Sequence, residues 1–256
     1  MIVGANIESI ASLSDTLVSE LVAPPPAEVG VCPRCRTWTN VYDGAECENC
    51  DEIAEALGVS AVSLSVVSLY SKPSLLRDWL TRYKGRVDDS EPFIESYVPI
   101  VRALLGRFFI EHGQAMWALS NGLDGVVVVP STDRAGPHPL EEILRSLELS
   151  LPMLPILRRG SGDLRFRHPS PEGYSVTGQS REERRLLLVD DVYTTGARIN
   201  SAAYALSQAG YVVCSAVVIA RRINPDYCPP ALEFWNRQRA SPFDWATSPV
   251  VVGATT

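Results

Sequence analysis

The sequence predicts an α/β fold in which a mostly parallel sheet is flanked by helices. Two short apolar runs, at residues 186–189 and 211–219, have the composition of buried strands, and the segment 197–209 between them has helical spacing. A third apolar run, at 125–130, also has the composition of a buried strand. Strands that alternate with helices are typical of a parallel sheet covered on both faces.

Length and composition limit the class of protein. The chain has 256 residues, 46% of them hydrophobic, which is enough for one large domain or for one domain with appendages. A net charge of −7 gives no general basic field, so unspecific binding to nucleic acid or to an anionic membrane is not expected. No apolar run approaches the ~18 residues of a membrane span, and no secretory signal is recognisable. Six cysteines are too few for a disulfide scaffold, so we expect a cytoplasmic protein.

The N-terminal segment is expected to dock on the domain that follows it. Residues 7–21 carry aliphatic side chains at helical spacing, and the prolines within 23–27 predict a stiff spacer after this helix. The aliphatic residues are Ile7, Ile10, Leu13, Leu17 and Leu21.

Two Cys-x-x-Cys knuckles follow, formed by Cys32 and Cys35 and by Cys47 and Cys50. This spacing lets four thiolates surround one tetrahedral Zn²⁺, and because no coordination position stays open the metal would be structural. The sequence Asp43-Gly44 predicts a tight turn between two short strands. The alternative is a pair of disulfides or free thiols, and a reducing cytoplasm disfavours the disulfides. Zinc binding, about 10–16 kcal/mol in finger peptides, would supply the folding energy of a segment with almost no core.

The segment between the cysteines and residue 157 contains further elements of the sheet and its covering helices. At 61–66 apolar and polar residues alternate, which predicts a half-buried strand. Pro99 is expected to kink or divide a long helix that Pro92 opens. The expected helices are 75–83, 92–119 and 139–147, and a short strand is expected at 152–157.

The residues that carry chemistry follow the strand at 186–189. Two acceptor-only carboxylates, Asp190 and Asp191, suit a pair of vicinal hydroxyls. A turn of Thr194, Thr195 and Gly196 at a helix start offers N–H groups, hydroxyls and a positive dipole end, which suit a phosphate monoester. A ribose 5-phosphate has both features. The alternative is that the two acids complement the helix dipole while Thr195 caps the helix.

The run Leu187-Leu188-Val189-Asp190-Asp191-Val192-Tyr193-Thr194-Thr195-Gly196-Ala197 resembles the phosphoribosyl-pyrophosphate (PRPP) signature of type I phosphoribosyltransferases. The resemblance implies that fold, with Asp190 and Asp191 on the ribose hydroxyls and Mg²⁺ on the diphosphate. The residues that it assigns to the 5-phosphate are Val192, Tyr193, Thr194, Thr195, Gly196 and Ala197.

Two further segments take their expected roles from this resemblance. The loop 131–136 matches the family's pyrophosphate loop by position, with Ser131, Thr132 and Arg134 as candidates; Arg134 suits a diphosphate but could equally be a surface residue. The segment 158–168, with four arginines and one aspartate, matches a flexible loop that closes over PRPP and excludes water. Its candidates are Arg158 and Arg159. The alternatives are a solvated connection or a polyanion site.

The cysteine knuckles and the PRPP-like run together resemble the ComF-like (competence protein F) family, which joins a zinc element to a phosphoribosyltransferase domain. Tyr70, Leu75-Leu76 and Tyr83-Lys84-Gly85 are similar to the segment that precedes the catalytic domain in that family. Residues 137–142 replace an Arg-Gly-x-Asn-Gln segment that is usual there. The implied organisation is a helix and linker at 1–30, a four-cysteine zinc element at 31–57, a phosphoribosyltransferase domain at 58–225 and a tail at 226–256, whose aromatic residues are expected to pack back on the domain.

The expected function is therefore PRPP-dependent transfer of phosphoribosyl to an unidentified nitrogen acceptor, with release of pyrophosphate. The candidate catalytic residues are Asp190, Asp191 and Arg134. The alternative is a protein that senses PRPP or a nucleotide without catalysis, because ComF-like proteins are associated with DNA uptake. Single-stranded DNA or the DNA-uptake machinery would then be the partner, and the departure at 137–142 slightly favours this alternative.

Overall fold

The computed structural model describes residues 4, 6–39, 46–86, 88, 90–131, 138–179, 182 and 184–247. The described part is a mixed α/β structure around a four-stranded sheet with the strand order β1-β6-β5-β2, in which every neighbouring pair is parallel. The strands are β1 (Leu64–Tyr70), β2 (Gly125–Val128), β5 (Arg184–Tyr193) and β6 (Tyr211–Arg222). The predicted α/β class, with a mostly parallel sheet flanked by helices, is confirmed.

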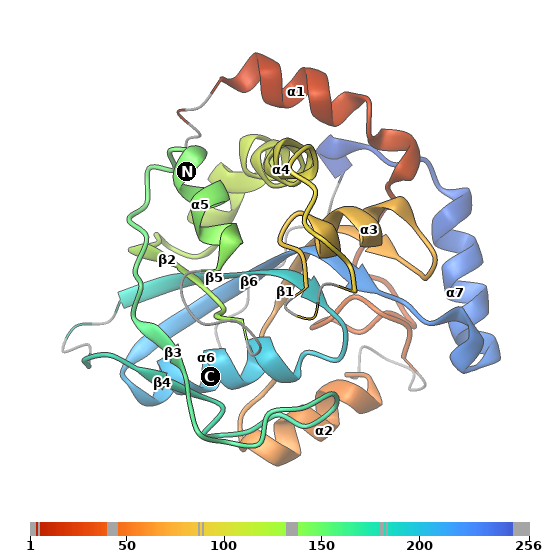
Figure 1. Ribbon diagram of the computed structural model, residues 1–256. Coiled ribbons are helices and arrows are strands. Elements are labelled where there is room, and N and C mark those ends of the chain that lie inside the picture. Colours follow the sequence, from red (N-terminus) through yellow and green to blue (C-terminus); the bar gives the residue numbers. More distant parts are fainter. Residues whose placement is uncertain are drawn as a thin grey trace.

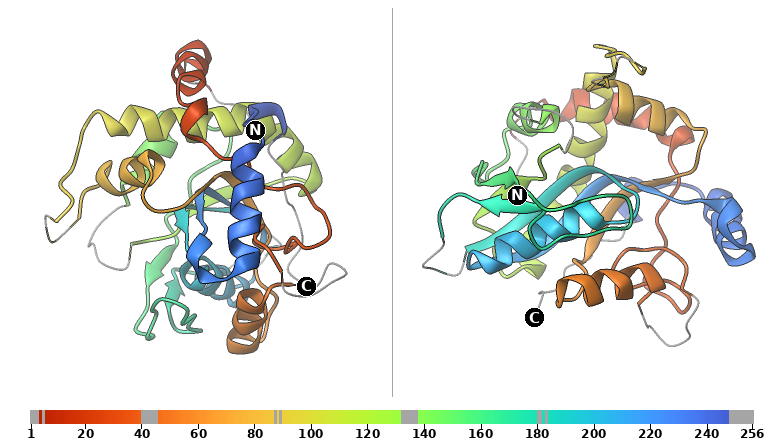
Figure 2. Two further views of the ribbon diagram at one scale, coloured as in Figure 1. Left: turned by 90° about the vertical axis from the view of Figure 1, so that its right-hand side faces the viewer. Right: turned by 60° about the horizontal axis from the view of Figure 1, so that its bottom comes forward.

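Helices cover both faces of this sheet (Figure 1). On one face lie α3, α4 and α5, with α1 packed across α4; on the other face lies α6, with α2 beyond it, and α7 runs along one side (Figures 1 and 2). The helices are α1 (Ile7–Asp15), α2 (Glu48–Leu57), α3 (Leu75–Arg82), α4 (Tyr97–Leu119), α5 (Pro139–Ser146), α6 (Ala197–Gln208) and α7 (Pro229–Ala240), and the short 3-10 helices are η1 (Val18–Glu20), η2 (Pro225–Tyr227) and η3 (Trp245–Thr247). In the described part of the chain, none of these helices has the length and apolar character needed to cross a membrane.

Each strand of the sheet contributes to two hydrophobic cores. Leu186 and Leu188 pack in the core on the α2 and α6 side, whereas Leu187 and Val189 pack in the core under α3, α4 and α5. Because successive side chains of a strand point to opposite faces, a strand buried on both faces needs an unbroken apolar run. This explains why the run at 186–189 shows no alternation.

The strand β1 differs from its prediction. The alternation at 61–66 predicts a half-buried strand, but β1 begins at Leu64 and is buried at every position, Ser65 and Ser68 included. The N-terminal segment covers this edge of the sheet, since Val22 forms an antiparallel bridge with Leu69. The Ser68 hydroxyl accepts a hydrogen bond from the Val22 amide at 2.9 Å, so this polar side chain is satisfied inside the protein.

The N-terminal helix docks as expected, although it ends earlier. The α1 helix stops at Asp15 and is followed by η1, and Ile10, Leu17 and Leu21 are buried against the domain. The spacer that follows is not free of the domain, because Pro24 and Pro25 are buried.

The long helix starts later than predicted. The α4 helix begins at Tyr97, not at Pro92, and Pro99 lies in its first turn. A proline there neither kinks nor divides the helix, because the first N–H groups of a helix have no partner within it. Phe93, which precedes the helix, is 56% exposed.

The basic segment at 158–168 is part of an antiparallel hairpin. The hairpin pairs β3 (Leu157–Arg159) with β4 (Tyr174–Val176). Of the strand expected at 152–157, Met153 forms an isolated parallel bridge with Val126 of β2, and Leu157 begins β3. The guanidinium group of Arg159 donates hydrogen bonds to the carbonyl oxygens of Gly162, at 2.8 Å, and Gly173. These hydrogen bonds fix the start of the β3–β4 connection to its own backbone.

The C-terminal tail contains a helix that the sequence analysis does not anticipate. In α7, Phe234 and Trp235 are buried, and Trp245 beyond it is also buried. The expectation that the aromatic residues of the tail pack back on the domain is confirmed for these three.

Candidate functional site

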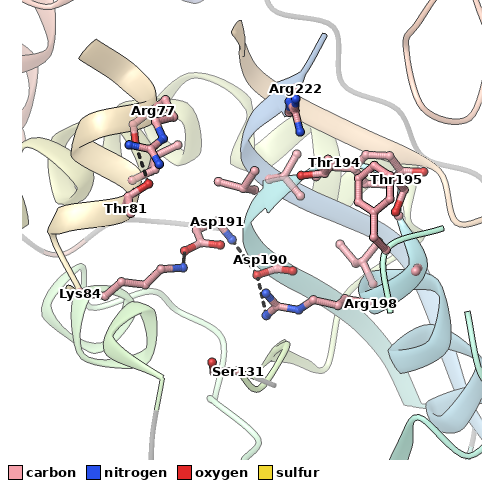
Figure 3. A pocket seen from close by; sticks show the side chains of 18 of the residues that line it. Arg77, Thr81, Lys84, Ser131, Asp190, Asp191, Thr194, Thr195, Arg198 and Arg222 are labelled. Carbon is pink, nitrogen blue, oxygen red and sulfur yellow. Dashed lines mark hydrogen bonds and ion pairs between the residues drawn. The ribbon is translucent and has the colours of Figure 1, made fainter. Parts of the chain in front are cut away.

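A cavity of about 770 Å³ opens at the carboxyl ends of the parallel strands (Figure 3). Tyr70 at the end of β1, Tyr193 at the end of β5 and Arg222 at the end of β6 line it, together with Ser131 shortly after β2. Open α/β sheets bind their ligands at this edge. The charged side chains around the cavity are Lys72, Arg77, Lys84, Arg86, Arg165, Arg198 and Arg222, and Asp88, Asp190 and Asp191. Cations are therefore in excess, which suits an anionic ligand.

The two predicted acids lie together in this cavity and are still part of β5. Asp190 and Asp191 are 2% and 1% exposed. The carboxylate of Asp191 accepts a hydrogen bond from the Tyr83 hydroxyl at 3.0 Å and pairs with the Lys84 ammonium group. The Oδ1 atom of Asp190 accepts a hydrogen bond from the Asp191 amide at 2.9 Å and lies 3.6 Å from the Nη2 atom of Arg198. Both acids are therefore oriented by neighbouring groups.

The two carboxyl groups are not equivalent. Burial, reinforced by the negative charge of Asp191, raises the pKa of Asp190 to about 6, although Arg198 opposes the shift. Burial also acts on Asp191, but the positive charge of Lys84, with a further contribution from Arg198, outweighs it and holds the pKa of Asp191 below its ordinary value. Asp191 is therefore the more acidic carboxyl group of the pair, and Asp190 keeps its proton to a higher pH than an exposed aspartate. Such a pair can bind two adjacent hydroxyl groups by accepting hydrogen bonds from both.

His138 lies beside these acids and precedes α5. Its side-chain Nδ1 accepts the amide of Leu140 at 3.1 Å, and Glu141 completes a capping box at this helix start. One ligand atom each of His138, Asp190 and Asp191 lies within 4.8 Å of the others. His138 therefore brings an imidazole group to the acid pair from the start of α5.

The turn after β5 leads directly into α6. Gly196 forms the N-cap with φ of +82°, and a Cβ atom there would collide with the Tyr193 hydroxyl, so glycine is required. In the described part of the chain no side chain caps α6. The hydroxyl of Thr195 instead accepts a hydrogen bond from the Arg167 amide at 3.2 Å, so the interpretation of Thr195 as a helix cap is wrong. The positive end of the helix faces the cavity, as a phosphate site requires.

Two distant elements fix this turn from behind. The side-chain amide of Asn49, on α2, donates to the carbonyl oxygen of Thr195 at 2.8 Å. The guanidinium group of Arg221, on β6, donates to the carbonyl oxygen of Thr194 at 2.7 Å. The turn thereby connects the cysteine segment with the end of the sheet.

The predicted site residues divide into three groups. The cavity is lined by Ser131, Asp190, Asp191, Val192, Tyr193, Thr194, Thr195, Gly196 and Ala197. Arg158 and Arg159 are not among the described residues that line the cavity. From the same segment, Leu164, Arg165 and Phe166 line it instead. Thr132 and Arg134 lie outside the described residues, as does the expected turn at Asp43-Gly44.

The sequence analysis missed the cations that follow β1. Lys72, Arg77, Lys84 and Arg86 all line the cavity, and Arg198 and Arg222 complete the set. In Figure 3, Arg77 and Lys84 extend from the α3 side, and Arg198 reaches the acids from α6. The only signal in the sequence is the density of basic residues between 72 and 86, which by itself resembles a solvated helix face.

The four knuckle cysteines form one buried cluster beside the sheet. One Sγ atom each of Cys32, Cys35, Cys47 and Cys50 lies within 4.8 Å of the others. The Sγ atoms of Cys32 and Cys50 are 3.8 Å apart, and those of Cys35 and Cys47 are 3.5 Å apart. Disulfides require about 2.05 Å, whereas a tetrahedral ion with bonds of about 2.3 Å separates its sulfur ligands by about 3.8 Å. The cluster could therefore bind a metal ion such as zinc.

A buried arginine connects this cluster to the sheet. The Nε atom of Arg221 donates to the Cys35 carbonyl oxygen at 3.3 Å, and its Nη2 atom lies 3.9 Å from the Cys35 sulfur. Such contacts orient ligands and balance the charge of thiolates.

No protein-family model matches this chain, and no curated protein matches it. The resemblance to phosphoribosyltransferases therefore rests on the motifs of the chain alone.

Proposed function

We propose that the chain is a PRPP-dependent phosphoribosyltransferase with the type I fold, similar to ComF-like proteins, that transfers phosphoribosyl to a nitrogen acceptor and releases pyrophosphate. One observation carries the proposal: a single cavity combines a buried acid pair, a helix start behind a Thr-Thr-Gly turn and an excess of cations. These three features match the hydroxyls, the 5-phosphate and the diphosphate of PRPP.

The acid pair and the turn would fix the ribose 5-phosphate. Asp191 would accept a hydrogen bond from one ribose hydroxyl, and Asp190 would accept a hydrogen bond from the other. The first amides of α6 and the Thr194 hydroxyl would bind the phosphate oxygens. Because the buried Tyr83 hydroxyl holds Asp191 and Arg198 faces Asp190, little reorganisation is needed when the sugar binds.

The cations opposite the turn would bind the diphosphate. Lys72, Arg77 and Lys84 lie on the segment that follows β1, and they could stabilise the negative charge that grows on the leaving group. Mg²⁺ would enter with the diphosphate and neutralise part of its charge, since this ion usually combines one or two carboxylates with substrate phosphates. Leu164 and Phe166 could limit the access of water to the reacting carbon.

The cysteine cluster would have a structural role in this protein. Its sulfur distances fit Zn²⁺, and four thiolates leave no coordination position for a substrate. Through Asn49 the zinc element would support the phosphate turn.

The decisive experiment is calorimetric titration of the protein with PRPP and Mg²⁺, followed by an assay of pyrophosphate release with candidate nitrogen bases. We expect saturable binding that the double variant Asp190→Asn/Asp191→Asn loses. The control is Asp15→Asn, which changes an exposed acid on α1 outside the cavity. Circular dichroism of all variants shows whether they are folded.

Three outcomes are informative. Binding with turnover supports the transferase, and binding without turnover supports the alternative, a sensor of PRPP. Absence of PRPP binding to the folded wild-type protein would overturn both. In that case the salt dependence of single-stranded DNA binding becomes the next measurement, because phosphate contacts weaken steeply as salt rises.

A further inference from the structure

A second, smaller cavity of about 270 Å³ lies behind the Thr194-Thr195 turn. It is enclosed by three segments that are far apart in sequence: the cysteine segment, the tip of the β3–β4 hairpin and the chain after β6. Thr194, Thr195, Phe166 and Arg222 line both cavities. The carbonyl oxygens of the turn are already hydrogen-bonded by Asn49 and Arg221, so the turn separates the two spaces.

Aromatic side chains form much of the wall of this second cavity. Trp38, Phe166 and Tyr227 line it, and the rings of Trp38 and Tyr227 are 6.1 Å apart with an interplanar angle of 45°. Phe166 is 67% exposed and Tyr227 is 51% exposed, so both rings are accessible to a ligand. Because the two rings are inclined, a flat aromatic ligand would stack on one of them, and the Tyr227 ring is half exposed.

Polar groups accompany the rings. Two cationic side chains line this cavity. The guanidinium group of Arg167 lies 5.6 Å from the centroid of the Tyr227 ring, and Arg222 lines both this cavity and the acid-pair cavity.

The size limits the ligand to one ring system. Pockets for drug-sized ligands occupy about 300–1,000 Å³, so about 270 Å³ suits a single heterocycle. Rings for stacking and arginines for a phosphate are groups that bind nucleotides.

We propose that this cavity binds the base of a nucleoside monophosphate, with the phosphate directed to Arg222 and Arg167. The base stacks on the half-exposed ring of Tyr227. The site is distinct from the acid-pair cavity and does not depend on the function proposed for that cavity.

The test uses adenosine 5′-monophosphate in equilibrium dialysis with the full chain. The Tyr227→Ala variant removes a half-exposed ring that lines only the second cavity, and we expect it to weaken binding about tenfold, as loss of a stacking ring does. Trp117→Ala, at an exposed ring on α4 outside both cavities, is the matched control and should bind like wild type. Inorganic phosphate and adenosine, tested separately, should each bind more weakly than the nucleotide.

The double variant Asp190→Asn/Asp191→Asn separates this proposal from the proposed function. Retained nucleotide binding in that variant, together with a loss in Tyr227→Ala, supports the second site whether or not PRPP binds to the first. Lack of saturable binding at millimolar nucleotide would overturn it. Binding that the double Asn variant loses and Tyr227→Ala keeps would also overturn it, because the nucleotide would then occupy the first cavity.

Discussion

The cysteine cluster and the acid pair both place ionisable side chains in the interior, but they stabilise them in different ways. Cys32, Cys35, Cys47 and Cys50 are close in sequence and converge on one point that could hold a metal ion. Asp190 and Asp191 are adjacent in sequence, yet the hydroxyl and ammonium groups that hold Asp191 come from residues 108 and 107 positions away. A local motif can therefore complete one buried polar site, whereas the other needs the whole sheet.

This difference predicts how each region fails. A metal cluster loses its stability in one step when its ion is removed, because the thiolates then have no common partner. The acid pair has several partners, so each substitution should remove only part of its stability. The experiments below compare the two regions, from the largest expected effect to the smallest.

Loss of the metal should have the largest effect. Removal of the ion by a chelator, or the substitution Cys50→Ser, should unfold the segment around α2, since zinc binding contributes about 10–16 kcal/mol in finger peptides. Metal analysis and amide hydrogen exchange of residues 46–57 measure this. Cys228→Ser, at a cysteine outside the cluster, is the control and should retain one ion per chain. Unchanged exchange after complete removal of the metal would contradict the structural role.

Substitution of the cation beside Asp191 should have an intermediate effect. Lys84→Met leaves a carboxylate that is 1% exposed without its ammonium partner, which should lower the free energy of unfolding at pH 7 by about 3 kcal/mol. We take the lower end of the usual range because the Lys84 side chain is 24% exposed. Urea denaturation measures the change. The double variant Lys84→Met/Asp191→Asn should recover part of it, and purely additive losses would show that the two residues do not interact.

The same pair should give a pH dependence of defined sign. The pKa of Asp191 is lower in the folded protein than in the unfolded chain. The ionised Asp191 therefore stabilises the folded protein fully above about pH 3.9, the ordinary pKa of aspartate, and this stabilisation declines as the pH falls below that value. The difference in unfolding free energy between wild type and Lys84→Met should therefore shrink between pH 4 and pH 3. A difference that stays constant over this range would argue against an ionic origin.

The smallest effect is expected at the contact that joins the two regions. Asn49→Ala removes the hydrogen bond between α2 and the carbonyl oxygen of Thr195, which should lower the free energy of unfolding by about 1 kcal/mol. It should also loosen the Thr194-Thr195 turn, which would be visible as faster hydrogen exchange of the amides at the start of α6. The control is Glu48→Ala, an exposed neighbour on the same helix. Equal effects of the two substitutions would indicate that α2 is perturbed as a whole.

The sequence by itself determined the features that depend on neighbours along the chain. The four cysteines converge because their spacing allows it, and the order of strand, acids, turn and helix at 186–209 follows from an apolar run, a Gly at positive φ and the helical spacing of Ile199, Ala202 and Leu206. Periodicity and backbone sterics act over a few residues. They are therefore visible without a structure.

Only the tertiary structure decided which distant side chains meet. The strand order β1-β6-β5-β2 brings the segment after β1 to the acids at the end of β5, so Lys84 becomes the partner of Asp191. The alternation at 61–66 is misleading for the same reason: helices and the N-terminal segment cover β1 on every side and satisfy Ser68. Thr195 bonds to Arg167, 28 positions away, instead of capping α6, because the hairpin tip folds over the turn. These contacts depend on packing between segments far apart in the chain, and local sequence patterns carry no information on them.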